Sequence, residues 1–391
     1  MLESSIATRL KQALRSSIEN HEIAGANLMV LQDGKEIFYH EDGFADLSDH
    51  TPIRRDTIFR LYSMSKPVTA TAVMMLIERG QLDLFDPVSL YIPSFKQVKV
   101  EKHGQTVAPM REVTIQDLLH MTSGLMYGGE NQTGQYTEAL FQDTNARLRS
   151  DTPVSTLEFA SRLGQGTLAF EPGSSWTYGT SADVLGAVVE VVSGQRFGEF
   201  LQQELFEPLE MKDTGFWLSE EQRSRLAKTV QNDGSGKLKL YSDDHLGINH
   251  HFDREPAFES GGAGLASTLG DYAKFATMLL QEGRWNGHTL LQSKTIQKMT
   301  APSLTPAQQQ AFDSGYSAIG HSYGNQMRIL THSGQSGLIG HQGEYGWDGW
   351  LGAYFTNSPQ EKLTFLFMIQ KRDAGTLPIT RKLRNIVFSA F

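Results

Sequence analysis

Two side chains of this 391-residue chain have types and spacing that suit nucleophilic catalysis. Ser63 and Lys66 form the only S-x-x-K sequence in the chain, at the start of a predicted apolar helix. Residues three apart share a helix face, so we expect the Lys66 amine beside the Ser63 hydroxyl. A serine hydroxyl is a weak nucleophile until a base takes its proton, and burial lowers the pKa of a lysine toward that role. Such four-residue patterns also arise by chance, so a solvated Lys66 is the alternative.

The elements that must position these residues follow from hydrophobic spacing and turn signals. A helix is predicted over 63–79, ended by Gly80. Two β-rich runs, 26–32 and 35–40, flank Asp33-Gly34, a dipeptide that favours a hairpin turn. Later elements of the same kinds, three strands and a closing helix, are expected at 326–330, 351–356, 362–370 and 378–391.

This order of elements predicts an α+β fold. One antiparallel sheet is built from both chain ends and flanked by helices, and a mostly helical region interrupts it. We expect residues 1–87 and 254–391 to form a discontinuous α/β domain with the central sheet. Residues 88–253 are expected to form a mostly helical domain.

Composition excludes several classes of function. Lys and Arg number 35 against 44 Asp and Glu, a net charge of −9, which disfavours nucleic acid as a partner. The absence of cysteine excludes a thiolate nucleophile and Cys-based metal sites. The N-terminal stretch lacks signal-peptide features, and the longest apolar run, 68–77, is about half the ~20 residues of a membrane span. We expect a cytoplasmic protein without a membrane span, cofactor or metal; its oligomeric state stays open.

Three segments resemble motifs of one known family. They are Leu61–Lys66, Leu118–Leu125 and Gly261–Thr268. Together they resemble the serine β-lactamase and penicillin-binding protein superfamily, and more narrowly the family VIII carboxylesterases of its class C-related branch. The resemblance runs over nearly the whole chain. It implies the β-lactamase/transpeptidase-like fold and a serine hydrolase that forms an acyl-enzyme on Ser63 from a small-molecule ester.

A second motif of this family is similar to the segment that starts at Tyr178. Tyr178–Gly186 resembles the Tyr-Ser-x-Ala-x-Asp-Val-Leu-Gly of the esterase branch. The resemblance implies that Tyr178 exchanges a proton with Ser63 and the leaving group. The pKa of a free tyrosine, near 10, would have to fall, and the Lys66 ammonium acts in that direction. Whether Lys66 or Tyr178 is the base stays open. Thr180 replaces the family's Asn and is a predicted substrate contact.

The third motif differs from that of β-lactamases and D,D-peptidases, which carry Lys-Thr-Gly. The segment here is similar to the esterases' Trp-x-Gly, and its predicted substrate contacts are Trp347, Asp348 and Gly349. The replacement removes a cation and adds an anion, so it penalises substrates with a carboxylate and favours neutral esters. A compensating cation, such as Arg328 or Lys371, would overturn this expectation.

The resemblance also implies an oxyanion hole formed by the backbone N–H groups of Ser63 and Trp350. Aromatic residues near the motifs predict an apolar substrate pocket; they are Trp176, Tyr345, Trp347 and Trp350. The Gly-rich segment 126–136 is a candidate rim or lid. Residues 260–264 are expected to form a tight active-site wall, because no parallel βαβ unit surrounds them as a dinucleotide loop would require.

Two rival sites have weaker support. Ser322 lies in a G-x-S-x-G sequence, but no acid stands between it and the following His332 or His341, as an α/β-hydrolase triad requires. We expect Ser322 in a glycine-rich surface turn. The Asp- and His-rich segment 243–253 has no recognised metal-ligand spacing and is expected to be a solvated loop near the cleft.

Other functions use the same residues. A β-lactamase, a D,D-carboxypeptidase or a D-aminopeptidase would share Ser63, Lys66 and Tyr178 but have a different pocket wall. An inactive, β-lactamase-like binding module is a further alternative. The physiological substrate and its acyl chain length are not encoded in these motifs.

Overall fold

The centre of the fold is an antiparallel sheet with strands from both ends of the chain. The structure, a computed structural model, describes residues 1–102, 104–316 and 318–391. Eight strands pair in the order β13-β14-β15-β16-β17-β1-β2-β3. Three come from the N-terminal part, β1 (Gly25–Gln32), β2 (Lys35–Asp46) and β3 (Thr51–Pro52). The other five come from the C-terminal part, β13 (His321–Tyr323), β14 (Arg328–Leu330), β15 (Tyr345–Asp348), β16 (Tyr354–Ser358) and β17 (Leu363–Met368). The predicted α+β fold with a sheet from both chain ends is confirmed.

The β1–β2 hairpin turns where the sequence predicts it. Asp33 and Gly34 both have positive φ, 51° and 73°, as a type I′ turn requires. Strand β1 is buried along nearly its whole length and pairs with β17 in the register Asn27↔Met368. A hydrophobic strand paired on both sides in this way belongs to the middle of a sheet.

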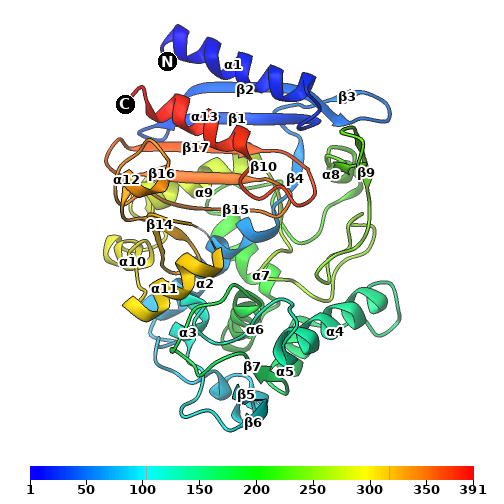
Figure 1. The fold of residues 1–391 in the computed structure, drawn as a ribbon, viewed down its shortest axis with the longest axis vertical. Helices are drawn as coiled ribbons and strands as arrows, with labels where there is room; N and C mark the ends of the chain where they lie inside the picture. Colours follow the sequence, from blue (N-terminus) through cyan, green and yellow to red (C-terminus); the bar gives the residue numbers. More distant parts are fainter. Residues whose placement is uncertain (103, 317) are drawn as a thin grey trace.

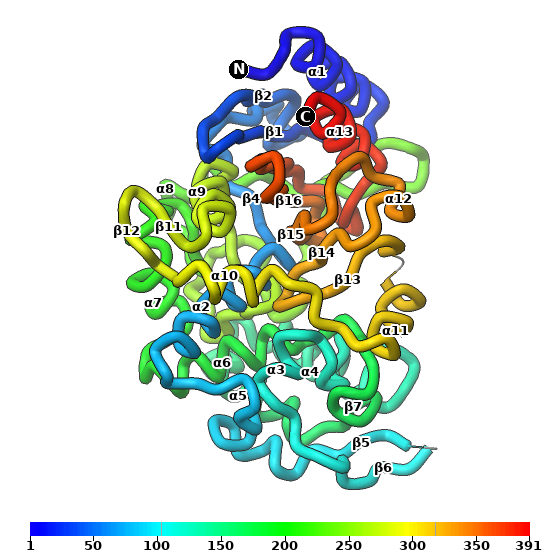
Figure 2. Tube along the Cα trace, turned by 90° about the vertical axis from the view of Figure 1, so that its left-hand side faces the viewer, coloured from blue at the N-terminus to red at the C-terminus, as the bar shows by residue number. Residues whose placement is uncertain are grey.

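Helices cover both faces of the sheet. Helices α1 (Ser4–Glu19) and α13 (Pro378–Phe388) pack against each other and enclose one hydrophobic cluster with β1 and β17. Both termini lie at this end of the molecule (Figures 1 and 2). Helix α9 (Leu269–Leu280) contacts β1, β16 and β17. The larger hydrophobic cluster includes α9 residues and extends to the helical region beyond.

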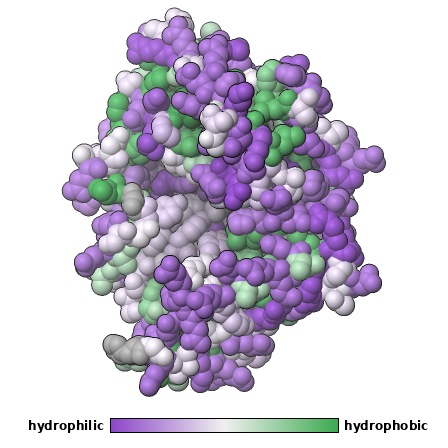
Figure 3. All heavy atoms as spheres, turned by 45° about the vertical axis from the view of Figure 1, so that its right-hand side comes forward, coloured by the Kyte–Doolittle hydropathy of each residue, from purple (hydrophilic) through white to green (hydrophobic). Residues whose placement is uncertain are grey.

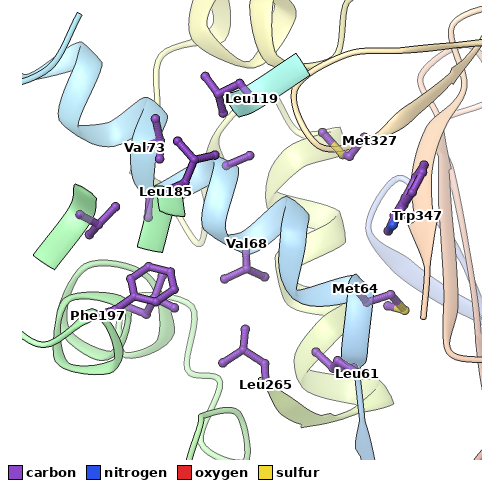
Figure 4. Packing of buried hydrophobic residues seen from close by; sticks show 14 of the residues in the cluster. Leu61, Met64, Val68, Val73, Leu119, Leu185, Phe197, Leu265, Met327 and Trp347 are labelled. Carbon is purple, nitrogen blue, oxygen red and sulfur yellow. The ribbon is translucent and has the colours of Figure 1, made fainter. Parts of the chain in front are cut away.

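Helix α2 (Ser65–Glu78) runs through this larger cluster. It is apolar all round and buried over most of its length, as expected of a central helix. A 3₁₀ turn, Tyr62–Met64, precedes it, and Gly80 with φ 67° follows it. The helix packs on α6 (Ser181–Ser193). Figure 4 shows Leu265 facing Val68, and Leu185 close to the C-terminal half of α2, near Val73. The helix predicted from residue 63 is confirmed, with Ser63 in the preceding turn.

The described residues between 88 and 253 form helices but also five short strands that we did not predict. The helices are α3 (Ile115–His120), α4 (Gln132–Arg147), α5 (Thr156–Leu163), α6, α7 (Phe197–Leu201) and α8 (Glu220–Ser224). The strands are β5 (Lys99–Lys102), β6 (Gln105–Val107), β7 (Thr167–Leu168), β8 (Thr229–Asn232) and β9 (Leu238–Tyr241). Two to four residues are too few to show an alternating pattern. The division into two domains at 87/88 and 253/254 stays a prediction.

In the last third of the chain, the observed strands also differ from the predicted ones. Strands β14, β16 and β17 overlap the predicted runs, whereas β13 and β15 were not expected. The remaining helices and strands are β4 (Ile58–Arg60), β10 (Ala266–Thr268), β11 (Arg284–Trp285), β12 (His288–Thr289), α10 (Ser293–Met299), α11 (Pro306–Tyr316) and α12 (Ser333–Ser336). The face seen in Figure 3 is mainly hydrophilic with small hydrophobic groups. In the described part of the chain, no helix has the length and apolar character needed to cross a bilayer.

Candidate active site

The Ser63 hydroxyl and the Lys66 amine meet at the start of α2. The Lys66 Nζ atom lies 3.1 Å from Ser63 Oγ, as the spacing of three residues predicts. The Lys66 side chain is fully buried, so it is not a solvated helix charge. Burial lowers the pKa of Lys66 from its ordinary value to about 7, and the charges of Asp183 and Asp348 act in the opposite direction. The amine is therefore able to accept a proton near neutral pH.

Two further acceptors surround the Lys66 amine. Its Nζ lies 2.8 Å from the Tyr127 hydroxyl and 2.8 Å from the Gly262 carbonyl oxygen. The Gly262 carbonyl only accepts, whereas the Tyr127 hydroxyl can accept from an ammonium or donate to a neutral amine. Sequence reasoning assigned Tyr127 only to a rim. Because Tyr127 follows shortly after the motif that ends at Leu125, the sequence indicated that it lies near the site. It did not indicate the hydrogen bond to Lys66.

Asp183 holds the wall segment that presents the Gly262 carbonyl to Lys66. Its Oδ1 accepts from Ser260 Oγ at 2.5 Å and from the Gly262 amide at 3.1 Å. A Cβ on residue 262 would lie 2.9 Å from Asp183 Oδ2 and 3.0 Å from the Tyr127 hydroxyl, so this approach requires glycine. The structure thus places the Gly262 carbonyl against Lys66, but residues 260–264 are not among the described residues that line the cavity, so their role as an active-site wall stays a prediction.

Tyr178 lies beside the same amine. The Lys66 Nζ atom is 4.7 Å from the centre of the Tyr178 ring, and Trp347 Nε1 donates to the Tyr178 hydroxyl at 3.2 Å. Burial raises the pKa of Tyr178, while hydrogen bonds from Ser63 and Trp347 favour the phenolate and oppose this rise. Our expectation that the Tyr178 pKa falls was wrong, because burial outweighs the stabilisation by neighbouring donors. Tyr178 is a neutral phenol at pH 7.

A cavity of about 490 Å³ opens beside these residues. Its lining residues are Ser63, Tyr127, Gly128, Glu138, Phe141, Gln142, Asn145, Tyr178, His245, Leu246 and Trp350. The four residues from α4 have the spacing i, i+3, i+4, i+7 and so share one face of that helix. Asn145 Oδ1 also accepts from the Gly247 amide at 2.8 Å, which ties the 245–248 loop to α4. The cavity is therefore bounded by a helix face, a loop and the Ser63 turn.

Tyr62 connects the two residues of the predicted oxyanion hole, Ser63 and Trp350. It directly precedes Ser63 in the chain, and its ring packs against that of Trp350. The Tyr62 and Trp350 rings meet edge to face with centroids 4.9 Å apart. Tyr62 has a φ of 45°, an unfavourable conformation for a bulky residue, and its buried packing keeps it there. In the described part of the chain, no hydrogen bond engages the Trp350 amide. The role of the Ser63 and Trp350 amides as oxyanion donors stays a prediction.

The predicted substrate contacts of the second and third motifs lie behind the cavity wall. Trp347 is fully buried against Tyr178, and Thr180 is fully buried, its hydroxyl without a hydrogen-bond partner among the described residues. Asp348 and Gly349 are likewise not among the described residues that line the cavity. Trp347 therefore acts on the site through its hydrogen bond to Tyr178.

The charge added by Asp348 is compensated. Arg328 Nη1 donates to Asp348 Oδ1 at 2.5 Å, and both side chains are almost completely buried. Lys371, the other candidate cation, instead donates to the Glu22 carbonyl. Our inference that Asp348 itself penalises anionic substrates was therefore wrong, because a buried, paired carboxylate presents little net charge to its surroundings.

Gly349 allows the third motif to approach the Ser63 turn. A Cβ on residue 349 would lie 2.2 Å from the Leu61 carbonyl oxygen. We expect Gly349→Ala to destabilise the protein by about 1–3 kcal/mol through this clash and to lower the turnover of esters, because it displaces the turn. Urea unfolding and kcat, measured together, check this expectation. Gly334→Ala is the matched control, since a Cβ there meets nothing within 4 Å. Equal stability of both variants would contradict the close approach.

The rival sites do not assemble. Ser322 lies on strand β13, paired with Ile329 and buried, rather than in the expected surface turn, because Gly320 rather than Ser322 adopts positive φ. In the 243–253 segment, Asp244 pairs with Arg149, and the His245 ring lies 4.3 Å from that of Trp350. Within the residues that the structure describes, no cluster of His, Asp and Glu could hold a metal ion.

Comparisons with known proteins show the family of this chain. The sequence model of the family described as "Beta-lactamase" matches residues 10–385. Esterase EstB of Burkholderia gladioli is 28% identical over 396 residues, covering 99% of this chain and 96% of the relative. Monacolin J acid methylbutanoyltransferase of Aspergillus terreus is 28% identical over 84% of this chain and 80% of its own. The solved structure of "EstCE1, a hydrolase with promiscuous acyltransferase activity" superposes with a TM-score of 0.85 at 25% identity, covering 98% of each chain. Because the match spans nearly all of its length, the chain belongs to the Beta-lactamase family.

Proposed function

We propose that this serine hydrolase is a carboxylesterase that acts on neutral esters of short or medium acyl chains. Ser63 Oγ bonds to the ester carbonyl carbon, the bond from that carbon to the alcohol oxygen breaks, and the alcohol leaves with a proton. Water then attacks the acyl-enzyme, releases the carboxylic acid and returns a proton to Ser63. The observation that carries the proposal is the buried Lys66 amine, 3.1 Å from the Ser63 hydroxyl.

The shifted pKa values support one division of roles. A general base works best when its pKa lies near the operating pH, and the pKa of Lys66 is about 7. Burial raises the pKa of Tyr178, so the phenol keeps its proton and is suited to donate it to the leaving alcohol. Lys66 is therefore the proposed base for acylation, and Tyr178 the proposed acid. The two groups are close enough to titrate as a coupled pair.

The cavity supports esters as the substrate class. Four aromatic side chains and Leu246 are among the residues that line the cavity beside Ser63, and its volume of about 490 Å³ suits a small ester. The cation that recognises a carboxylate in Lys-Thr-Gly enzymes is absent from the third motif, and Arg328 is engaged by Asp348. The esterase relative points in the same direction.

A substrate panel tests the proposal. The purified protein is given p-nitrophenyl butyrate, nitrocefin and a D-alanyl-D-alanine peptide, and a fluorophosphonate probe is used to label its nucleophile. We expect the ester to have the highest kcat/KM and the label to map to Ser63. Faster turnover of nitrocefin or of the peptide would support the β-lactamase or peptidase alternatives. An unlabelled, inactive protein would support the binding module.

Transfer of the acyl group to an alcohol is a second candidate. The relatives include a methylbutanoyltransferase, and EstCE1 is a hydrolase with promiscuous acyltransferase activity. Chemically, an alcohol replaces water in the second step, and an ester forms instead of an acid. Adding 1-butanol to the p-nitrophenyl butyrate reaction and measuring butyl butyrate against butyric acid distinguishes the two outcomes.

A further inference from the structure

One carboxylate lines the proposed catalytic cavity without a partner among the described residues. Glu138 lines the cavity from α4 and is exposed to solvent. Its Oε2 atom lies 3.9 Å from the position of a Cβ on Gly128, the residue after Tyr127. Among the described residues, no ion pair or side-chain hydrogen bond engages this carboxylate. The Glu138 charge is therefore directed at the cavity mouth without a partner in the described part of the protein.

The other lining residues do not balance this charge. Ten of the eleven are apolar, aromatic, neutral polar or His245. Burial lowers the pKa of His245 below its ordinary 6.5, so its ring is neutral at pH 7. The Lys66 amine lies behind the wall, fully buried and hydrogen-bonded. Arg149, on the nearby loop after α4, is paired with Asp244 and Asp253.

Two other properties of the protein favour a cationic ligand in this cavity. The net charge of the chain is −9, which raises the local concentration of cations at the surface. Aromatic side chains, which attract alkylammonium groups, line the cavity at Tyr127, Phe141, Tyr178 and Trp350. Gln142, exposed one turn from Glu138, supplies a neutral hydrogen-bonding neighbour on the same helix face.

We propose that the cavity selects esters that carry an alkylammonium group, and that the Glu138 carboxylate is the counter-ion for this group. The inference rests on the proposed ester hydrolysis at Ser63 and adds a preference to it: neutral esters remain substrates, and an alkylammonium group on the ester raises kcat/KM. Unit charges about 4 Å apart change an equilibrium constant by a factor of about five in water, and by more near a protein surface. Glu138 is thus a specificity-determining residue that leaves the chemical step untouched.

The test uses esters matched in length and different in charge. The acyl series consists of p-nitrophenyl hexanoate, p-nitrophenyl 6-(trimethylammonio)hexanoate and the mono-p-nitrophenyl ester of adipic acid. The alcohol series compares butyrylcholine with its neutral isostere, 3,3-dimethylbutyl butyrate. For Glu138→Gln we expect kcat/KM of the cationic ester to fall about fivefold to tenfold in at least one series. The anionic ester should gain by a similar factor, and neutral esters should change less than twofold. The series that responds identifies the half of the ester that lies near Glu138.

Further variants separate a local effect from a change in net charge. Glu19→Gln removes the same charge from the exposed end of α1, which lies at the top of the molecule in Figure 1, whereas α4 lies in the lower half; it should leave all ratios unchanged. Glu138→Lys should reverse the preference between cationic and anionic esters. If neutral esters are hydrolysed but Glu138→Gln changes all esters of both series equally, the inference is overturned while the proposed function stands. If neutral esters are not hydrolysed by the parent, the proposed function itself fails.

Discussion

The Ser63→Ala variant is expected to lose ester hydrolysis almost completely. Loss of a nucleophile removes covalent catalysis as a whole, and kcat/KM should fall by a factor on the order of 10⁵. Ser63 lies on the cavity wall, and only its hydroxyl is removed, so the fold and the cavity should persist. Initial rates with p-nitrophenyl butyrate and the mass of the acylated protein measure the effect.

Ser322→Ala is the control for this prediction. Ser322 is the serine of the G-x-S-x-G sequence and lies buried on strand β13. Its replacement should leave kcat/KM within about twofold and labelling by a fluorophosphonate intact. Loss of activity in Ser322→Ala together with full activity in Ser63→Ala would refute the assignment of the nucleophile.

The Lys66→Met variant should show the second largest loss. Methionine has a similar length but cannot accept the Ser63 proton, and removal of a general base lowers the rate about 10²- to 10⁴-fold. In the parent, the base is active when neutral, so kcat/KM should rise with pH through about 7 and then level off. The variant should lack this rise. A parent profile that is flat between pH 5 and 9 would contradict the role of Lys66.

The same variant has a second, independent readout. The pKa of Lys66 is about 7 in the folded protein against an ordinary 10.5, so the unfolded chain binds more protons between these values. The free energy of unfolding of the parent should therefore increase with pH from about 7 to 10.5 relative to that of Lys66→Met. Urea unfolding at pH 7 and 10 measures this difference. Because Ser63→Ala keeps the amine, it should follow the parent.

Some of the site could be predicted because its geometry is local. Ser63 and Lys66 are three residues apart, and helix geometry alone brings them together. Tyr178 reaches them through the packing of α6 on α2, a long-range contact that no spacing encodes; only the resemblance to a family identified it. The resemblance did not assign a contact with Lys66 to Tyr127. Its contact with Lys66 depends on how the loop after α3 folds over α2.

The pairing of Asp348 with Arg328 at the third motif could not be predicted from the sequence, for a different reason. Arg328 pairs with Gly346 in the sheet register, so Asp348 is its diagonal neighbour on the adjacent strand. This relation exists only once the register of β14 and β15 is known, and neither the bounds of β14 nor the existence of β15 was predicted correctly. Long elements with clear periodicity, such as α2 and the first hairpin, were predictable. Strands of two to four residues depend on their partners and were not.

The pairing of β1 with β17 also constrains how the chain is made in a cell. Strand β1 leaves the ribosome before its partner, which follows about 340 residues later. Until then, the Leu28–Leu31 segment has no neighbour on that edge and is prone to non-native association. During this interval, the strand relies for cover on neighbours that are already made, such as β2, which pairs with it, and α1, which shares its hydrophobic cluster.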